Sequence, residues 1–214
     1  MRRTFQHESR CNPVERGIRP TEVAKQYLDR GLSRFMDGSS EDAMAEHCYR
    51  EAWVTAYSWA IPTEEALEAI QTEMTFRAGW RIHDPMCGTG YWASLLRERG
   101  VSVIASDESP YNSPWAHASH IDDAIKGDAV KMVEKFCTGG LLLVWPPYNC
   151  DIASRVLKAF CGSLLFYVGE NSYHPCTGDP AFHKQLEEEW NFKRFVDLPN
   201  WNGINDDLMI FERK

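Results

Sequence analysis

The sequence predicts an α/β fold in which N-terminal helices precede a doubly wound, mostly parallel, seven-stranded sheet. From residue 80 onward, short apolar runs alternate with segments of helical period, which is the pattern of repeated strand–helix–strand units. The connection 199–206 between the last two apolar runs is too short to hold a crossover helix. The last strand is therefore predicted to be antiparallel, and helices are expected on both faces of the sheet.

Three helices are predicted ahead of the sheet, because apolar residues recur there at a helical spacing. They span 23–36, 39–59 and 66–74. Asp37-Gly38 ends the first, and a proline followed by two glutamates opens the third. The chain then divides into a basic tail (1–20), a helical extension (21–75) and a sheet-bearing domain (76–214).

Seven strands and four helices are predicted within the sheet-bearing domain. The short apolar or alternating runs assigned to strands are 80–84, 101–106, 121–125, 141–145, 163–168, 192–198 and 207–212. The run 121–125 carries the weakest pattern. The segments of helical period among them are 90–99, 129–137, 151–160 and 180–190.

Composition and charge narrow the class of protein. The 214 residues include 43% hydrophobic and 12% aromatic residues, which suits a packed globular protein. No apolar run approaches the ~18 residues of a membrane span, and the N-terminus lacks the apolar segment of a secretory signal. The net charge of −8 disfavours extended nucleic-acid binding, although five arginines within residues 1–20 keep a phosphate-contacting arm open.

The seven cysteines are scattered and show no Cys-x-x-Cys spacing. Such a pattern favours free thiols in a reducing compartment over a disulfide framework or a zinc site. His117-x-x-His120 and His174-Pro-Cys176 also lack a recognised four-ligand spacing, so no metal is expected. These observations predict a cytoplasmic protein, with a nuclear location left open.

The most informative segment is Asp-Pro-Met-Cys-Gly-Thr-Gly-Tyr-Trp, which starts at Asp84 at the end of a predicted strand. Ligands of open parallel sheets bind at the carboxyl ends of strands, and Gly88 and Gly90 allow the backbone to approach a ligand closely. Asp107 ends the next predicted strand, where its carboxylate could accept both hydroxyls of a ribose. The alternative is a strand-to-helix turn in which the glycines only relieve crowding.

Two classes of cofactor use this arrangement. A dinucleotide site follows Gly-x-Gly-x-x-Gly and directs helix N-terminal amides at a diphosphate, and here the third glycine position is Ala93. Asp84 would repel a diphosphate, whereas it would attract the cationic amino-acid end of S-adenosylmethionine (SAM). The sequence therefore favours SAM over NAD or NADP.

A second informative segment is Trp145-Pro146-Pro147-Tyr148, which follows a predicted strand. Two consecutive prolines restrict the backbone and remove two amide donors, so strand-end carbonyls stay available beside the cofactor loop. A turn stiffened in this way can hold a substrate group in one orientation, with Tyr148 as a flat surface. The alternative is a rigid strand–helix connection with a buried tyrosine.

The glycine segment resembles that of class I SAM-dependent methyltransferases, and the similarity covers roughly residues 62–214. The acid followed by Gly-x-Gly in that family matches Asp84, Gly88 and Gly90, with Cys87 inside the loop. The form Asp-Pro-x-x-Gly-x-Gly is similar to that of amino-methyltransferases. The resemblance implies a Rossmann-like methyltransferase fold with SAM held at this loop.

The resemblance also implies roles for residues farther along the chain. Asp107 matches the acid that takes the ribose hydroxyls, and Asp128 matches an acid that meets the adenine amino group. Trp145 to Tyr148 resembles Asp/Asn/Ser-Pro-Pro-Tyr, in which the first residue and a proline carbonyl hold the target amine while the tyrosine stacks on its ring. The chain departs from this motif at Trp145, because an indole N–H donates a hydrogen bond but cannot accept one.

We therefore expect a SAM-dependent methyltransferase that acts on a planar, nitrogen-containing acceptor held at the Trp145–Tyr148 turn. The acceptor is a small molecule, or a group on a base or a protein. A catalytically silent SAM-binding or partner protein is the main alternative, since Trp145 replaces the polar amine-holding residue. An NAD(P)-dependent oxidoreductase is a further alternative.

Three more residues are predicted near the same edge of the sheet. Glu170 of Glu170-Asn171 either serves as a general base or holds an ammonium group, or it is a member of a cap or ion pair. Trp201 of Trp201-Asn202 either lines a substrate pocket or covers the sheet edge. Trp59 either closes over the methionine end of the cofactor or packs between helices.

Overall fold

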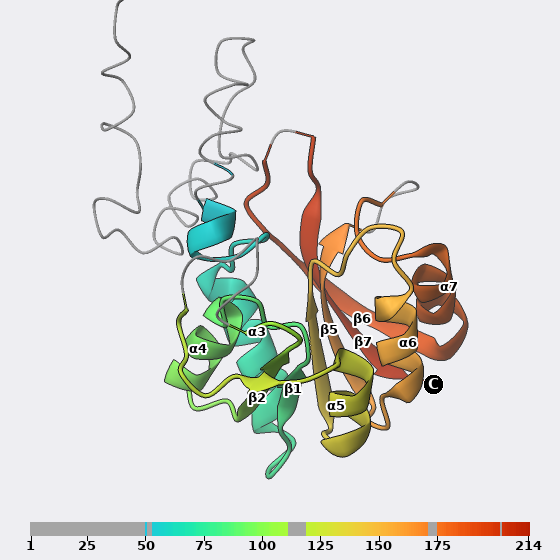
Figure 1. The fold of residues 1–214 in the computed structure, drawn as a ribbon. Coiled ribbons are helices and arrows are strands. Elements are labelled where there is room, and N and C mark those ends of the chain that lie inside the picture. The colour runs from blue at the N-terminus through green and yellow to red at the C-terminus, as the bar shows by residue number, and fades with distance from the viewer. Residues whose placement is uncertain (1–49, 51–52, 111–118, 171–174, 202) are drawn as a thin grey trace, which may run out of the picture.

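The computed structural model describes residues 50, 53–110, 119–170, 175–201 and 203–214. They form the predicted α/β fold, in which helices cover both faces of one seven-stranded sheet (Figure 1). The strands are β1 (Ile82–Asp84), β2 (Val103–Asp107), β3 (Ile125–Lys126), β4 (Gly140–Val144), β5 (Leu164–Glu170), β6 (Trp190–Asp197) and β7 (Asp206–Arg213). The helices are α3 (Glu64–Thr75), α4 (Tyr91–Glu98), α5 (Ala129–Lys135), α6 (Ile152–Ala159) and α7 (Pro180–Glu189).

The strands lie in the order β3-β2-β1-β4-β5-β7-β6. Strands β1 to β5 pair in parallel, whereas β7 is antiparallel to both of its neighbours, β5 and β6. The prediction of a mostly parallel sheet with an antiparallel last strand is confirmed. The strand order and directions thus agree with the doubly wound α/β fold that the sequence predicted.

The boundaries of most elements lie close to those predicted, and the third strand is the exception. It was predicted at 121–125 but is found at Ile125–Lys126, which pairs with Ser106 and Asp107 of β2. The side chain of Ile121 instead lies against Gly90. Helix 23–36 lies outside the described residues, and from the predicted helix 39–59 residues 50 and 53–56 are helical.

Two apolar clusters cover the two faces of the sheet. On β4, Leu142 belongs to the cluster formed with α3 and α4, whereas Leu141 and Leu143 belong to the cluster formed with α5, α6 and α7. This alternation follows from the period of two in a strand, and burial on both faces explains the continuous apolar runs of β4 and β5. None of the helices among the described residues is long and apolar enough to cross a membrane.

Helix α3 starts where the sequence placed its opening residues. Thr63 is the N-cap, and its hydroxyl accepts a hydrogen bond from the backbone N–H of Ala66 at 3.1 Å. Leu67 and Ile70 of α3 are fully buried in the cluster that also contains Ile82 of β1. The helix assigned to the N-terminal extension therefore packs into the core of the sheet, and the boundary near residue 75 stays a prediction.

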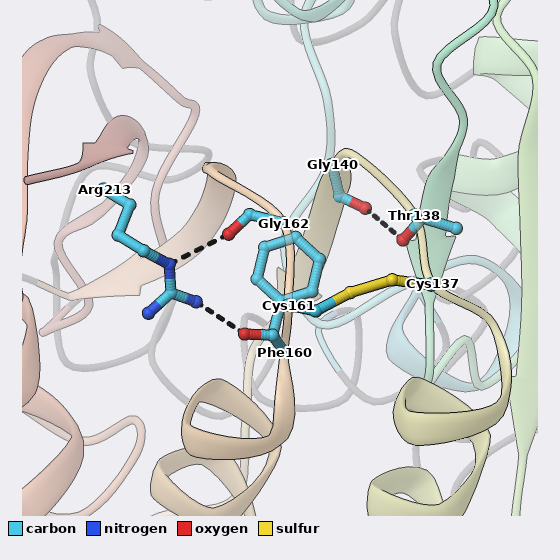
Figure 2. The surroundings of a disulfide bond; sticks show 7 residues. All are labelled: Cys137, Thr138, Gly140, Phe160, Cys161, Gly162 and Arg213. Carbon is cyan, nitrogen blue, oxygen red and sulfur yellow. Dashed lines mark hydrogen bonds between the residues drawn. A yellow bond between two sulfur atoms is a disulfide. The ribbon is translucent and has the colours of Figure 1, made fainter.

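A disulfide bond corrects the expectation of free thiols throughout the chain. Cys137 and Cys161 are joined, whereas Cys87, Cys150 and Cys176 are free (Figure 2). The bond connects the segments that lead into β4 and β5. Beside it, the guanidinium of Arg213 donates hydrogen bonds to the carbonyls of Phe160 and Gly162. Sequence spacing could not reveal this pair, because the parallel β4–β5 pairing brings together two cysteines 24 residues apart.

The disulfide is expected to stabilise the protein. A link across 24 residues restricts the unfolded chain, so Cys137→Ser should lower the free energy of unfolding by about 3 kcal/mol. Urea denaturation of the oxidised proteins measures this, and Cys150→Ser is the matched control. Wild type should drop to the stability of the Cys137→Ser variant when a reductant is added. Equal stability with and without the reductant would contradict this expectation.

Candidate functional site

The first part of the site is formed by the carboxyl ends of β1, β2 and β3. Asp84 ends β1 and pairs with Ala105 of β2, while Asp107 ends β2 and pairs with Lys126 of β3. Because these strands are parallel neighbours, their ends lie at one edge of the sheet. The structure therefore brings Asp84 and Asp107 to the same edge.

Hydrogen bonds connect Asp107 to the loops on both sides. Its Oδ2 accepts from the backbone N–H of Gly88 at 3.0 Å, and its Oδ1 accepts from that of Ser109 at 2.9 Å. Its backbone carbonyl accepts from the N–H of Gly127 at 2.9 Å. Asp107 thus joins the glycine loop to the segment that begins α5.

Asp84 is a buried carboxylic acid. Its side chain is 2% exposed, and Oδ1 is buried with no hydrogen-bond partner among the described residues. Burial raises the pKa of Asp84 to about 8, with a further contribution from the negative charge of Asp107. An unpaired buried oxygen is costly, so this position favours a cationic or hydrogen-bond-donating ligand group.

The glycine loop between β1 and α4 requires glycine at two positions. Gly88 has φ of +52° and Gly90, the N-cap of α4, has φ of +73°. A Cβ at Gly88 would meet no atom within 4 Å, whereas a Cβ at Gly90 would lie 2.4 Å from Cγ1 of Ile121. Burial raises the pKa of the thiol of Cys87, which directly precedes Gly88, so Cys87 is held as a neutral thiol.

A shallow depression that is open to solvent lies next to this loop and includes Ser119, His120, Ile121 and Asp122 in its lining. Ile121 belongs both to this lining and to the contact with Gly90. His120 is fixed there, because its backbone N–H donates to the carbonyl of Thr89 and its ring stacks on Tyr57.

Asp128 has a local structural role. It is the N-cap of α5, and its Oδ1 accepts from the backbone N–H of Lys131 at 3.0 Å. It follows Gly127, whose N–H bonds to the end of β2, so Asp128 lies beside the ends of β2 and β3. A role toward adenine stays a prediction.

The Trp145–Tyr148 turn is tied to the loop that follows β5. The N–H of Trp145 donates to the carbonyl of Val168, and the N–H of Gly178 donates to the carbonyl of Pro146 at 2.9 Å. The Pro146 carbonyl thus already accepts one hydrogen bond from the neighbouring loop, and its second lone pair is left for a ligand, so its availability stays a prediction. Pro147 is exposed and Tyr148 is 69% exposed, so the tyrosine ring is accessible.

The side chain of Trp145 is held on several sides. Its Nε1–H donates to Oδ2 of Asp206 at 2.7 Å, and its ring stacks on Trp59 with centroids 4.9 Å apart and planes inclined by 14°. The guanidinium of Arg50 lies over both rings, 5.0 Å from Trp59 and 5.4 Å from Trp145. Trp59 therefore packs against Trp145. Neither closure over the cofactor nor packing between helices, the two roles predicted for Trp59, included this contact.

Residues 57–61 connect this turn to the glycine loop. The hydroxyl of Thr89 donates to the carbonyl of Tyr57, and Nε1–H of Trp92 donates to the carbonyl of Ala60 at 2.9 Å. Trp59 lies between these two anchors in the sequence and stacks on Trp145. One segment thus links the two motifs that the sequence singled out.

Two further predicted residues, Glu170 and Trp201, are buried. Glu170 is 4% exposed, and its two carboxylate oxygens accept from the backbone N–H groups of Cys176 and Asn205, so the cap interpretation holds in this geometry. Trp201 is buried with its ring edge against Trp53. Asn171, Asn202, His117 and His174 lie outside the described residues. Within the described part of the chain, no three metal-ligating side chains lie close enough to hold an ion.

Sequence reasoning missed Asp206, the hydrogen-bond partner of Trp145. The predicted strand 207–212 began one residue after it, and Asp206 looked like part of a surface loop. One signal was available. A last strand that runs antiparallel starts at the edge where the parallel strands end, and two acids stand at that start.

Comparison with known proteins shows a likeness of fold. The chain matches no protein-family model and no curated protein sequence. It is similar to a methyltransferase from Geobacter sulfurreducens, at 12% identity and a TM-score of 0.49, over 88% of this chain and 94% of that one. It is also similar to the magnesium protoporphyrin IX methyltransferase of Synechocystis PCC 6803 with bound SAM, at 12% identity and a TM-score of 0.48, over 91% and 96% of the two chains. At these values, neither likeness assigns a ligand or a substrate to this chain.

Substitutions at the two glycines should separate backbone strain from crowding. Gly88→Ala is expected to lower the free energy of unfolding by about 1–2 kcal/mol, because its positive φ disfavours a side chain. Gly90→Ala should cost at least about 1 kcal/mol more, because its Cβ also meets Ile121. Thermal and urea unfolding measure both variants. Adding Ile121→Ala should restore to Gly90→Ala the part of its stability that crowding removed, and should restore none to Gly88→Ala; equal effects would contradict the crowding at Gly90.

Proposed function

We propose that the protein is a SAM-dependent methyltransferase whose acceptor is a planar, nitrogen-containing group. The observation that carries this proposal is the pairing of two carboxylates around one glycine loop. Asp107 accepts the N–H of Gly88, and the buried Asp84 lies at the end of the adjacent strand with one unpaired oxygen. The methyltransferase fold of the chain is consistent with a cofactor at this edge.

The residues present fit the parts of SAM. The unpaired, buried Oδ1 of Asp84 suits the ammonium of the methionine part, which would stabilise the charged carboxylate. Each oxygen of Asp107 accepts one backbone N–H, and a carboxylate has about four acceptor positions, so two remain for ribose hydroxyls. Asp128 stands beside them at the start of α5 and is our candidate for the adenine amino group.

Bound SAM would supply a methyl group on a positively charged sulfur. The protein would then contribute orientation and exclusion of water. The exposed ring of Tyr148 offers a flat surface for the acceptor at the turn that follows β4, next to β1 in the sheet. Pro146 and Pro147 stiffen that turn, and Trp145 holds it against Trp59 and Asp206.

A silent SAM-binding protein remains the second candidate, and one observation favours it. Trp145 is already engaged by Asp206, Trp59 and Arg50, so its side chain does not offer the amine-holding group of the resembling motif. Methyl transfer to any fraction of a cell extract supplied with methyl-labelled SAM would exclude this candidate. An NAD(P)-dependent enzyme is a further candidate, which Asp84 would disfavour in its charged form because it would lie near the diphosphate.

Calorimetric titration with SAM tests the cofactor site. Wild type is expected to bind SAM, and Asp107→Asn to bind it at least about tenfold more weakly, since hydrogen bonds to a charged group are lost. Glu134→Gln removes an exposed carboxylate from α5 and should bind like wild type. Absence of binding by wild type, or equal binding by Asp107→Asn, counts against the proposal.

Proton release on binding tests the role of Asp84. Because the pKa of Asp84 is raised to about 8, its side chain is mostly protonated at pH 7 in the free protein. A cationic group beside it favours the carboxylate, so binding should release close to one proton and should strengthen as the pH rises toward 8. Titrations in buffers of different ionisation enthalpy measure the proton. Asp84→Asn should release none, and Glu134→Gln should release as much as wild type; release by Asp84→Asn would refute this role.

A further inference from the structure

Asp206 carries a buried oxygen that nothing in the described part of the chain satisfies. Its side chain is 2% exposed, and Oδ2 accepts the Nε1–H of Trp145 at 2.7 Å. Its Oδ1 is also buried and has no hydrogen-bond partner among the described residues. Buried polar atoms are nearly always paired, so an unpaired carboxylate oxygen indicates a position for a hydrogen-bond donor from a ligand.

Asp206 lies at the edge of the sheet that carries the cofactor residues. It is the first residue of β7, which is antiparallel to β5, and it pairs there with Glu170 at the carboxyl end of β5. Trp145, its hydrogen-bond partner, directly follows the carboxyl end of β4. In the order β1-β4-β5-β7, Asp206 and Asp84 therefore stand on opposite sides of the β4 turn.

The side chain of Asp206 is held in place before any ligand binds. Its backbone N–H donates to Oδ1 of Asn200, and its carbonyl accepts from Nδ2 of the same residue. The ring of Trp145, which donates to Oδ2, is in turn stacked on Trp59. A fixed acceptor of this kind costs little reorganisation when a donor arrives.

The charges around Asp206 allow it to bind a proton near neutral pH. Burial raises the pKa of Asp206 to about 7. The hydrogen bond from Trp145 and the positive charge of Arg50 lower it, while the negative charges of Glu170 and Asp207 raise it. A carboxylate in this range can accept a proton from a substrate and return it to solvent.

We propose that Asp206 is a catalytic residue whose Oδ1 accepts the N–H of a flat, ring-bearing acceptor and then takes its proton, a role that rests on the proposed function. In the motif that this turn resembles, the polar residue at the position of Trp145 holds the target amine. Asp206 would hold that group from β7 instead. In the transfer, a bond forms between the acceptor nitrogen and the methyl carbon as the carbon–sulfur bond breaks. The electron pair of the broken bond stays on sulfur, and the proton of the nitrogen passes to Asp206.

The test uses two probes that differ only in the N–H. Indole is a flat ring with one N–H and no basic nitrogen, and 1-methylindole lacks that donor. Ligand-observed NMR with the full chain should show saturable binding of indole, at least about tenfold tighter than that of 1-methylindole, as expected for a hydrogen bond to a charged group. Asp206→Asn should lose this preference, and Asp207→Asn, an acid on the opposite face of the same strand, should keep it.

The pH dependence separates this role from a purely structural one. Indole binding by wild type should weaken as the pH falls through about 7, because Asp206 becomes protonated. Trp145→Phe removes the side-chain N–H that donates to Asp206, so the pH midpoint of probe binding should move upward. If Asp206 only anchors Trp145, probe binding should show no pH midpoint. Circular dichroism checks that each variant is folded.

Three results would overturn the inference. They are equal affinity of wild type for the two probes, no saturable binding of indole, or an unchanged preference in Asp206→Asn. SAM binding by Asp206→Asn, measured by calorimetry, should equal that of wild type. Failure of the cofactor site therefore appears in the SAM titration, and failure of this inference appears in the indole titrations.

Discussion

The parallel pairing of β1 with its neighbours β2 and β4 is the constraint on which the site depends. It places the ends of three strands at one edge, so that Asp84, Asp107 and the Trp145 turn face the same region. The hydrogen bond from the N–H of Gly88 to Asp107 then fixes the glycine loop against β2. Gly88 can make this contact because its backbone has a positive φ.

The same edge concentrates unfavourable electrostatics that the rest of the fold must offset. Asp84 and Asp206 are both buried, each has an oxygen without a partner among the described residues, and burial raises the pKa of both. Their folded-state pKa lies above the unfolded value, so the stability that they contribute is present at low pH and is lost as the pH rises toward 8. The mostly apolar strands β4 and β5, covered on both faces, provide the compensating burial. Perturbed carboxylates on such a stable support are typical of functional sites.

Residues 57–61 connect the two halves of this edge. Thr89 and Trp92 of the glycine loop and α4 bond to the carbonyls of Tyr57 and Ala60, and Trp59 stacks on Trp145. A movement of this segment would therefore reach both the glycine loop and the turn after β4. The stacked rings of Trp59 and Trp145 are part of this connection.

The sequence by itself determined the order of the elements, the antiparallel last strand, the placing of Asp84 and Asp107 at strand ends and that of Gly88 and Gly90 in the loop between them, because apolar periodicity and turn residues are local signals. The tertiary structure alone decided the position of β3, the disulfide between Cys137 and Cys161, and the partners of Trp145. The hydrogen bond from Trp145 to Asp206 joins residues 61 positions apart. The Pro146 carbonyl accepts a hydrogen bond from the N–H of Gly178 in another loop. Such contacts arise only when strands that are distant in the sequence become neighbours in the sheet, so no local pattern records them.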